Sequence, residues 1–339
     1  MMCKGIAPNV ITYTSLILGV CKLGEWKEAT RLLNEMVSKN IFPNVCTFNV
    51  LVDTLCKEGM VGEAEGMVEM MIERDIQPDT VTYNSLMDGY SLRGEMSKAR
   101  KVFKLMLSKG SMVNVVSYNT LINGYCKHKM TDKAMTLLQE MSRKGLVPNT
   151  VTYNTLVDGC CKVGKLGDAQ KLFSEVQACG QLPNVQTYAI LLDGLCLCIA
   201  EKIESARELF CGLSSRGLQP DVRTYTIMIN GLCIGGRTSE AEKLLTEMEE
   251  KGCPPNDCTY NIIIRGFINN NETVRVTGLI QQMVEKGFSA DAWTTELIVE
   301  LLGKDKVDPA LLPLMQKENY ELNLPQLKLN RSSDHPNKH

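Results

Sequence analysis

The chain has 339 residues, of which 44% are hydrophobic and 6% aromatic, and its formal net charge is −2. This near-neutral charge is not the basic footprint of an avid nucleic-acid binder. No apolar stretch reaches the roughly 18 residues that span a bilayer. The residues Met1 to Gly5 show neither the apolar core of a secretory signal nor the arginine- and serine-rich lead of an import signal. Composition therefore disfavours a membrane-spanning protein.

A short phrase recurs along the chain. Val-Thr-Tyr-Asn-(Ser/Thr)-Leu stands at 81–86 and 151–156, and looser copies begin at residues 11, 116 and 222. The 35-residue spacing predicts a repeat array rather than a pair of globular domains. The predicted units are 10–44, 45–79, 80–114, 115–149, 150–184, 185–221, 222–256 and 257–291. The sixth unit has 37 residues, with two extra near Cys198 and Ile199.

Each unit is predicted to form two helices joined by a turn. In the first unit, apolar residues spaced as on one helix face are Tyr13, Leu16, Ile17, Val20 and Cys21. A turn at Leu23 and Gly24 follows. The second helix repeats the apolar spacing at Ala29, Leu32, Leu33 and Met36. Threonine or serine opens the first helix of every unit, from Thr12 to Thr259, and is predicted to be its N-cap.

Helices this short are marginally stable alone in water. Because their apolar faces can be buried only against the partner helix and the neighbouring units, an all-α solenoid is predicted. Residues 1–9 resemble the tail of an incomplete unit, which indicates a truncated array. Residues 292–316 are predicted to form a degenerate capping helix pair, with Trp293 and Glu296 where the phrase would stand. Residues 317–339 are predicted to be a polar, disordered tail.

Fourteen cysteines raise the question of disulfides or metal. Six share one place near the end of the first helix, namely Cys21, Cys56, Cys126, Cys161, Cys196 and Cys233. Copies in successive units lie about one helix diameter, or roughly 10 Å, apart, whereas a disulfide needs Cα atoms within about 7 Å. No second cluster at zinc spacing accompanies Cys160–Cys161 or Cys196–Cys198. Buried thiols in a reducing compartment are therefore predicted, with no metal and no cofactor.

A second stripe runs along each first helix beside its apolar face. In the third unit the residues predicted to face the core are Tyr83, Leu86, Met87 and Tyr90. The residues predicted to form the stripe are Val81, Asn84, Asp88 and Leu92. Stacking of the first helices is expected to place the stripes on one continuous exposed surface.

Two positions are restricted to small polar residues in nearly every unit. The fifth residues are Thr14, Asn49, Asn84, Asn119, Asn154, Ala189, Thr226 and Asn261. The last residues are Asn44, Asp79, Asn114, Asn149, Asn184, Asp221, Asn256 and Asp291. Asparagine and threonine cost about 0.5 kcal/mol or more relative to alanine in a helix, so stability does not explain them, whereas both hydrogen-bond to base edges. The alternative is that the last residue caps the next helix and the fifth is inherited by duplication.

The unit reads Val-Thr-Tyr-Asn-x-Leu-(Ile/Val)-(Asp/Asn)-Gly-x-Cys-Lys, then Ala, Met and Lys-Gly-x-x-Pro-(Asn/Asp). Over residues 10–291 it resembles the P-class pentatricopeptide repeat of plant organelle RNA-binding proteins, and is most similar to the fertility-restorer-like group. The resemblance implies a right-handed superhelix that binds single-stranded RNA. Each unit would read one base through its fifth and last residues, with the N-terminal unit at the 5′ end.

By the same resemblance, threonine with asparagine favours A, asparagine with aspartate favours U, and asparagine with asparagine favours C or U, with C preferred. Ala189 and Asp221 in the sixth unit fit no strong rule. The predicted target is therefore 5′-A-U-Y-Y-Y-N-A-U-3′.

The resemblance also implies roles beside the base. The second residue of a unit wedges against bases, and the matching residues are Ile11, Val81, Val116 and Val151, whereas Cys46, Gln186, Arg223 and Cys258 depart. Lysines near the end of the first helix approach phosphates, and the matching residues are Lys22, Lys57, Lys127 and Lys162. Leu92, Leu197, Ile234 and Asn269 take that place in the other units. Modest affinity with a shallow salt dependence is expected, and a merely solvated role for the four lysines is the alternative.

No catalytic motif is recognised: the only histidines are His128, His335 and His339, and no catalytic domain is recognised after residue 291. The chain is therefore predicted not to be an enzyme. The resemblance implies that it affects the processing, stability or translation of organellar transcripts by occupying them. The predicted partners are single-stranded RNA and processing or translation proteins, with no membrane and no DNA. The resemblance favours the mitochondrion, then the chloroplast. A protein-binding helical scaffold and a non-functional truncated remnant stay open as alternatives.

Overall fold

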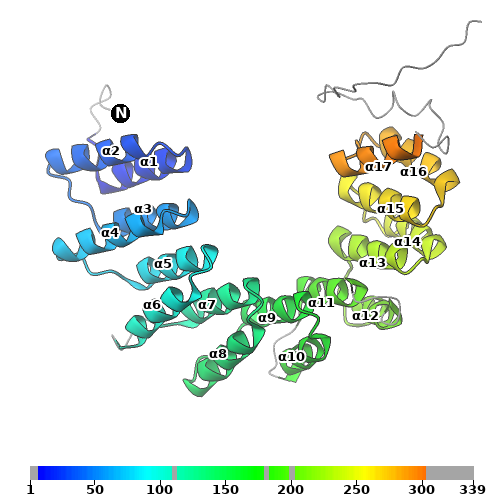
Figure 1. Cartoon of the computed structure of the whole chain (residues 1–339), viewed down its shortest axis with the longest axis horizontal. Coiled ribbons are helices and arrows are strands. Elements are labelled where there is room, and N and C mark those ends of the chain that lie inside the picture. The colour runs from blue at the N-terminus through cyan, green and yellow to red at the C-terminus, as the bar shows by residue number, and fades with distance from the viewer. Residues whose placement is uncertain (1–6, 109–112, 179–182, 198–202, 303–339) are drawn as a thin grey trace, which may run out of the picture. The chain divides into compact units, whose positions relative to one another are not determined.

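The computed structural model describes residues 7–108, 113–178, 183–197 and 203–302, and the regular structure there is helical throughout (Figure 1). The first helices of the repeats are α1 (Val10–Lys22), α3 (Val45–Lys57), α5 (Thr80–Leu92), α7 (Val115–Lys127), α9 (Thr150–Lys162), α11 (Val185–Leu197), α13 (Val222–Ile234) and α15 (Asp257–Asn269). The second helices are α2 (Trp26–Ser38), α4 (Val61–Glu73), α6 (Met96–Ser108), α8 (Thr131–Arg143), α10 (Leu166–Ala178), α12 (Ile203–Ser215), α14 (Thr238–Glu250) and α16 (Thr273–Glu285). Helix α17 (Ala292–Leu302) follows. The predicted all-α repeat fold is confirmed over these residues.

Each first helix begins at the first residue of the corresponding predicted unit. Several predictions fall outside the described residues. These are the start of the predicted N-terminal tail (1–6), the two extra residues of the sixth unit, the second helix of the terminal pair and the polar tail from 317.

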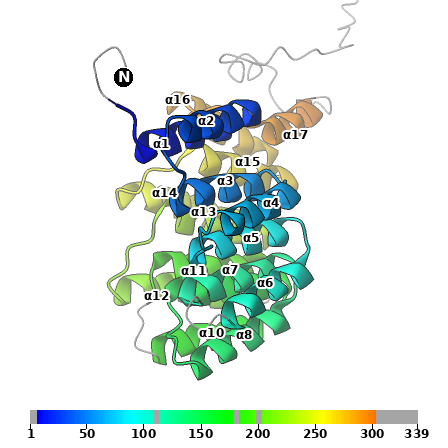
Figure 2. The same ribbon diagram turned by 90° about the vertical axis from the view of Figure 1, so that its left-hand side faces the viewer.

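The chain divides into two compact units, Met1–Met228 and Ile229–His339. Within the first unit, each first helix packs on its own second helix and on the first helices of neighbouring repeats. The first helices α1 to α11 therefore make one layer and the second helices make the other (Figures 1 and 2). Within the second unit, α15 packs against α14, α16 and α17.

A reciprocal cap begins most of the first helices, and α3 shows how. Asn44 has extended backbone angles, and its side-chain oxygen accepts from the backbone N–H of Thr47 at 3.1 Å. The Thr47 hydroxyl in turn accepts from the backbone N–H of Asn44 at 3.4 Å. The prediction that threonine is the N-cap is therefore wrong, because the last residue of the preceding repeat holds that place. Threonine stands three residues later, where glutamate usually completes a capping box.

The turn between the two helices of the first repeat is closed by Gly24. Its φ angle of 75° lies in the left-handed region, which costs glycine little. The backbone N–H groups of Gly24 and Glu25 reach back to the carbonyls of Cys21 and Val20. This turn provides hydrogen bonds to backbone carbonyl groups at the end of α1, and it directs α2 back along α1.

The apolar core follows the predicted spacing, with one exception. The predicted core side chains of α2 and α5 are at most 7% exposed. In α1, Tyr13, Ile17 and Cys21 are buried, but Leu16 is 50% exposed. Its counterpart in the second repeat, Leu51, packs into the core of the first repeat. Since no earlier repeat lies within the described residues, Leu16 has nothing to pack against there.

The recurring cysteines fill the contact between successive first helices. None of the described cysteines forms a disulfide, and Cys56, Cys126 and Cys233 are at most 6% exposed. A Cβ atom added to Gly89 would stand 2.7 Å from the Cβ and Sγ of Cys56. Cys126 lies in the same way against Gly159, and Cys233 against Gly266. The thiol of one repeat thus sits in the hollow left by the glycine of the next. The predicted burial is confirmed for five of the six recurring cysteines, whereas Cys161 is half-buried.

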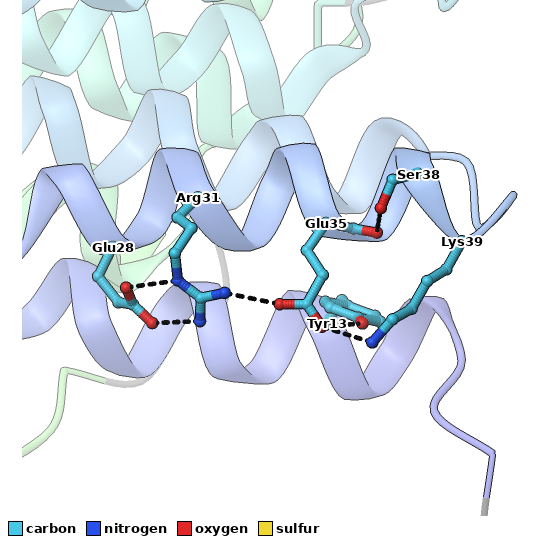
Figure 3. A network of polar contacts seen from close by, with 6 residues as sticks. All are labelled: Tyr13, Glu28, Arg31, Glu35, Ser38 and Lys39. Carbon is cyan, nitrogen blue, oxygen red and sulfur yellow. Dashed lines mark hydrogen bonds and ion pairs between the residues drawn. The ribbon is translucent and has the colours of Figure 1, made fainter.

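Polar side chains join the two helices of the first repeat (Figure 3). The buried ring of Tyr13 in α1 extends its hydroxyl to Glu35 of α2, to which it donates at 2.9 Å. Arg31 bridges Glu35 and Glu28 along α2. Tyr118 in α7 donates to Glu140 of α8 in the same manner, at 3.2 Å. These bonds satisfy hydroxyl groups that would otherwise be left at the edge of the core.

Candidate nucleic-acid interface

The fifth and last residues of a unit, here named its reading pair, meet in space although 30 residues separate them. In the second repeat, the side-chain amide of Asn49 donates to the carboxylate of Asp79 at 3.0 Å. In the fourth repeat, the amide of Asn119 donates to the amide oxygen of Asn149 at 3.2 Å. The helix pair and its connection bring the two positions together.

A third residue holds each of these two pairs. The hydroxyl of Thr82 donates to the Asn49 oxygen at 2.5 Å, and that of Thr152 donates to the Asn119 oxygen at 2.7 Å. These threonines are the capping residues of the next repeat, and both are fully buried. Sequence reasoning missed this bridge, although the recurrence of threonine or serine at the third place of every unit was the available signal.

Other pairs are connected less directly. In the first repeat, the hydroxyl groups of Thr14 and Thr47 lie 2.9 Å apart, and Thr47 also bonds to the Asn44 side chain. In the eighth, the side-chain oxygen of Asn261 accepts from the backbone N–H of Asp291 at 2.9 Å. In the third and fifth repeats, the side-chain oxygens of Asn84 and Asn154 are buried without a hydrogen-bond partner in the described structure. Ala189 is buried and has no polar group to contribute.

The two positions differ in exposure. The last residues are exposed except Asp79, which is half-buried. The fifth residues are half-buried from Thr14 to Asn154, and Ala189, Thr226 and Asn261 are buried. The prediction of an exposed stripe is therefore wrong for the fifth residues of the last three units, and the other five are only partly exposed. That position lies at the seam between two first helices, which the glycine contacts bring close together.

The last residue of every unit also begins the following helix. Asn44, Asp79, Asn114, Asn149 and Asn256 are N-caps that complete a capping box. The side chains of Asn184, Asp221 and Asp291 likewise accept from the backbone N–H three residues on, at 2.7 to 2.9 Å. The capping alternative drawn from the sequence is thus confirmed as one role of this position. The cap uses the Oδ1 atom and leaves the other side-chain atom of these residues outside it. At Asp291 that atom, Oδ2, accepts from Arg265 at 2.7 Å.

Apolar side chains stand next to the reading pairs. Ile11, Val81, Val116 and Val151 lie at the second place of their units and are 54 to 73% exposed. The residues that depart from this pattern, Cys46, Gln186, Arg223 and Cys258, are exposed as well. Four β-branched side chains thus stand exposed to water at one repeated place.

The four lysines predicted to reach phosphates are exposed, but their surroundings differ. Lys57 pairs with Asp53 at 2.6 Å, and Lys162 pairs with Asp158 at 2.7 Å. Lys22 and Lys127 make no ion pair with any residue that the structure describes. The aspartates stand one helical turn before the lysines, at the ninth place of the unit. Half of the lysines therefore have their charge balanced within the chain.

Burial affects the ionisation of this surface at two further aspartates. At the ninth place of the sixth unit, burial raises the pKa of Asp193, and the nearby Arg223 only partly offsets it. Burial also acts to raise the pKa of Asp79, but hydrogen bonds from Thr82, Asn49 and Val81 outweigh it and hold that pKa below its usual value. Asp79 is thus a carboxylate at neutral pH.

Sequence-family models cover most of the chain. The model described as PPR repeat family matches residues 8–57, 43–91, 113–162, 148–196 and 235–269. Of two further models described as PPR repeat, one matches residues 216–249 and the other matches residues 81–111 and 258–288. The chain belongs to the PPR repeat family. A comparison with curated proteins found no match.

Solved structures of PPR proteins share the fold. The crystal structure of the pentatricopeptide repeat protein PPR10 in complex with an 18-nt psaJ RNA element is 25% identical, with a TM-score of 0.70, and covers 90% of this PPR chain and 44% of that one. A form of PPR10 with three cysteines replaced by serine, in complex with the same element, is also 25% identical in sequence. Its TM-score is 0.69, and the match again covers 90% of this chain and 44% of that one. This PPR chain therefore spans less than half the length of the PPR10 chain in these two structures.

The structure offers no metal site or membrane span in the part that it describes. Over those ranges no three residues among His, Cys, Asp and Glu are grouped to hold a metal ion. No helix described is long and apolar enough to cross a bilayer.

Proposed function

We propose that this PPR chain binds single-stranded RNA sequence-specifically, one base per repeat, through its reading pairs. The observation that carries the proposal is the contact between Asn49 and Asp79, two residues from opposite ends of one repeat whose side chains meet beside exposed Val81. The PPR10 structures that share this fold hold an RNA element, which supports the same role for this chain.

The helix cap decides what each last residue offers to a base. Asn149 accepts from Thr152 through Oδ1, so its Nδ2 group remains to donate. Asp79 accepts from Thr82 through Oδ1, so its Oδ2 remains to accept. Asn49 donates one hydrogen of its Nδ2 group to Asp79, and the second hydrogen remains to donate to a base. Asn49 and Asp79 thus present a donor and an acceptor, whereas Asn119 and Asn149 present two donors. The eighth pair differs, because Asn261 is buried and donates to the backbone carbonyls of Asp257 and Ser289.

These patterns match pyrimidine edges. Uracil has an N–H at N3 between two carbonyl oxygens, so a donor and an acceptor complement it. Cytosine has acceptors at both O2 and N3, so two donors complement it. Adenine has an acceptor at N1, which fits the amide of Asn44 or Asn256. The hydrogen-bond chemistry therefore supports the first seven bases of the target 5′-A-U-Y-Y-Y-N-A-U-3′, whereas U at the eighth base is proposed from the sequence resemblance.

The cellular role is proposed from the sequence resemblance. The chain is placed among the P-class, fertility-restorer-like proteins of plants, acting on organellar transcripts in mitochondria, with chloroplasts second. It would alter processing, stability or translation by occupying RNA, with processing or translation proteins as further partners, and without catalysing a reaction itself.

Selection from a randomised single-stranded RNA pool, with sequencing of the retained fraction, tests the proposal. Enrichment of the target above is the expected result. Asn84→Thr combined with Asn114→Asp should move the third base to G. Asn114→Asp alone should move it to U, since aspartate caps α7 as well as asparagine does but replaces a donor with an acceptor.

Asn34→Asp is the matched control, because it makes the same charge change at an exposed site on α2. It should leave the enriched sequence unchanged. Absence of enrichment at low salt, from a protein whose circular dichroism is helical, would refute RNA reading. It would favour the protein-binding scaffold, which the net charge of −2 also suits, or a remnant without function.

A further inference from the structure

Three consecutive repeats carry the same reading pair but hold its fifth residue in different ways. The pairs of the third, fourth and fifth repeats are Asn84 with Asn114, Asn119 with Asn149, and Asn154 with Asn184. The three fifth residues are all half-buried, and the three last residues all cap the next helix through their side-chain oxygen. Any difference in base preference among these repeats must therefore come from the residues around the pair.

The fifth residue of the fourth repeat is held in one orientation. The Oδ1 atom of Asn119 accepts from the hydroxyl of Thr152 at 2.7 Å, and its Nδ2 group donates to Oδ1 of Asn149 at 3.2 Å. Thr152 is fully buried in α9, so its hydroxyl is fixed. A turned Asn119 amide would set its oxygen against the Asn149 oxygen, and two acceptors have no proton to share. Asn119 therefore presents a donor to a base.

The neighbouring fifth residues lack this restraint. The side-chain oxygens of Asn84 and Asn154 are buried, yet they accept no hydrogen bond from any residue that the structure describes. The residues at the place of Thr152 are Ser117 and Thr187, and they donate to the cap of their own helix instead, at 3.3 and 3.0 Å. A buried acceptor without a partner costs free energy, so nothing favours this orientation over the turned one. These two amides can turn and present either nitrogen or oxygen to a base.

We propose that Thr152 is a positioning residue that makes the fourth base C, whereas the third and fifth repeats accept C and U equally. This inference rests on the proposed RNA binding and divides the three pyrimidines of its target. Two donors complement O2 and N3 of cytosine, but a fixed donor meets the N3–H group of uracil donor to donor. An amide that turns replaces the donor with an acceptor and so complements uracil as well. The specificity of one repeat thus depends on a residue of the next.

Single-base changes in one RNA test the difference on the unaltered protein. Fluorescence anisotropy of a 5′ dye measures the affinity for 5′-AUCCCAAU-3′ and for three RNAs with U in place of C at the third, fourth or fifth base. U at the fourth base should weaken binding about tenfold, because it leaves a donor unpaired. U at the third or fifth base should change affinity little. Equal losses at the three places overturn the positioning role alone, whereas absence of binding to all four RNAs overturns the proposed function as well.

Variants of the third-place threonines separate positioning from capping. Thr152→Val keeps the size of the side chain but removes the hydroxyl, so U and C at the fourth base should bind alike. Thr152→Ser keeps the hydroxyl and should retain the preference for C. Thr187→Val is the matched control, because Thr187 is equally buried and completes a cap, but its hydroxyl bonds to Asn184 rather than to Asn154.

The control should lower the free energy of unfolding as Thr152→Val does, in urea unfolding followed by circular dichroism, yet leave every base preference unchanged. If Thr152→Val weakened binding to the four RNAs by one common factor, Thr152 would be a cap and nothing more. That result would overturn the proposal. Loss of discrimination at the fourth base only is the result expected of a positioning residue.

Discussion

The side-chain amide of Asn49 donates a hydrogen bond to the carboxylate of Asp79 at 3.0 Å, and the same carboxylate begins helix α5. One residue therefore begins a helix and, in the proposed function, also reads a base. A substitution that removes it would weaken binding for two different reasons. Experiments on this surface need variants that separate them.

Asp79→Ala should lower the free energy of unfolding by about 1 kcal/mol, because alanine cannot accept from the start of α5. Asp79→Asn should change stability little, since asparagine is an equally good cap. Urea unfolding followed by circular dichroism measures both. RNA selection with Asp79→Asn should move the second base from U to C. If Asp79→Ala and Asp79→Asn lowered the free energy of unfolding equally, loss of the helix cap would not explain the destabilisation.

Neutralising the aspartates beside two lysines should strengthen RNA binding. Asp53→Asn with Asp158→Asn frees Lys57 and Lys162 from their ion pairs and removes negative charge near the phosphates. A gain of about threefold per site is expected from the Coulomb energy at this separation in water. Affinity measured at several salt concentrations should also give a steeper slope. Asp132→Asn is the control, because Asp132 lies on the second helix α8 and pairs with Lys165. This substitution should leave RNA affinity unchanged.

Gly89→Ala should destabilise the array, because the new methyl group would overlap Cys56 at 2.7 Å. Overpacking of this kind costs about 1–3 kcal/mol. Gly66 in α4 is the control, since a Cβ atom there meets nothing within 4 Å. Gly66→Ala should stabilise the protein by about 0.5–1 kcal/mol through its helix preference. Thermal unfolding compares the two, and a neutral Gly89→Ala would contradict the tight helix contact.

The cysteines should divide into two classes of reactivity. Burial raises the pKa of Cys56, Cys126, Cys196 and Cys233 to about 12. At pH 8 these thiols stay protonated and covered, so a maleimide should modify them only when the protein unfolds. Cys46, Cys211 and Cys258 are exposed and should react within the folded protein. Mass spectrometry of digested protein after a short exposure distinguishes the classes, and early labelling of Cys56 would contradict the buried packing.

Much of the fold was fixed by local pattern. The 35-residue recurrence identified equivalent positions, and the apolar spacing placed two helices in each unit, because both depend only on neighbours along the chain. The same pattern indicated which residues belong to a reading pair and that the cysteines are buried. It also showed that Asn44 and its counterparts could be caps.

Contacts between repeats were decided by the tertiary structure alone. Stacking brought Thr82 against Asn49 and covered part or all of each fifth residue. It also left Leu16 exposed and set Arg265 against Trp293. The cap then determined which atom of each last residue remains for a base. The sequence shows which side chains carry hydrogen-bond donors and acceptors. Which of these groups already bond within the protein depends on the chain segments that lie beside them in space. A donor or acceptor that bonds within the protein is no longer available to RNA.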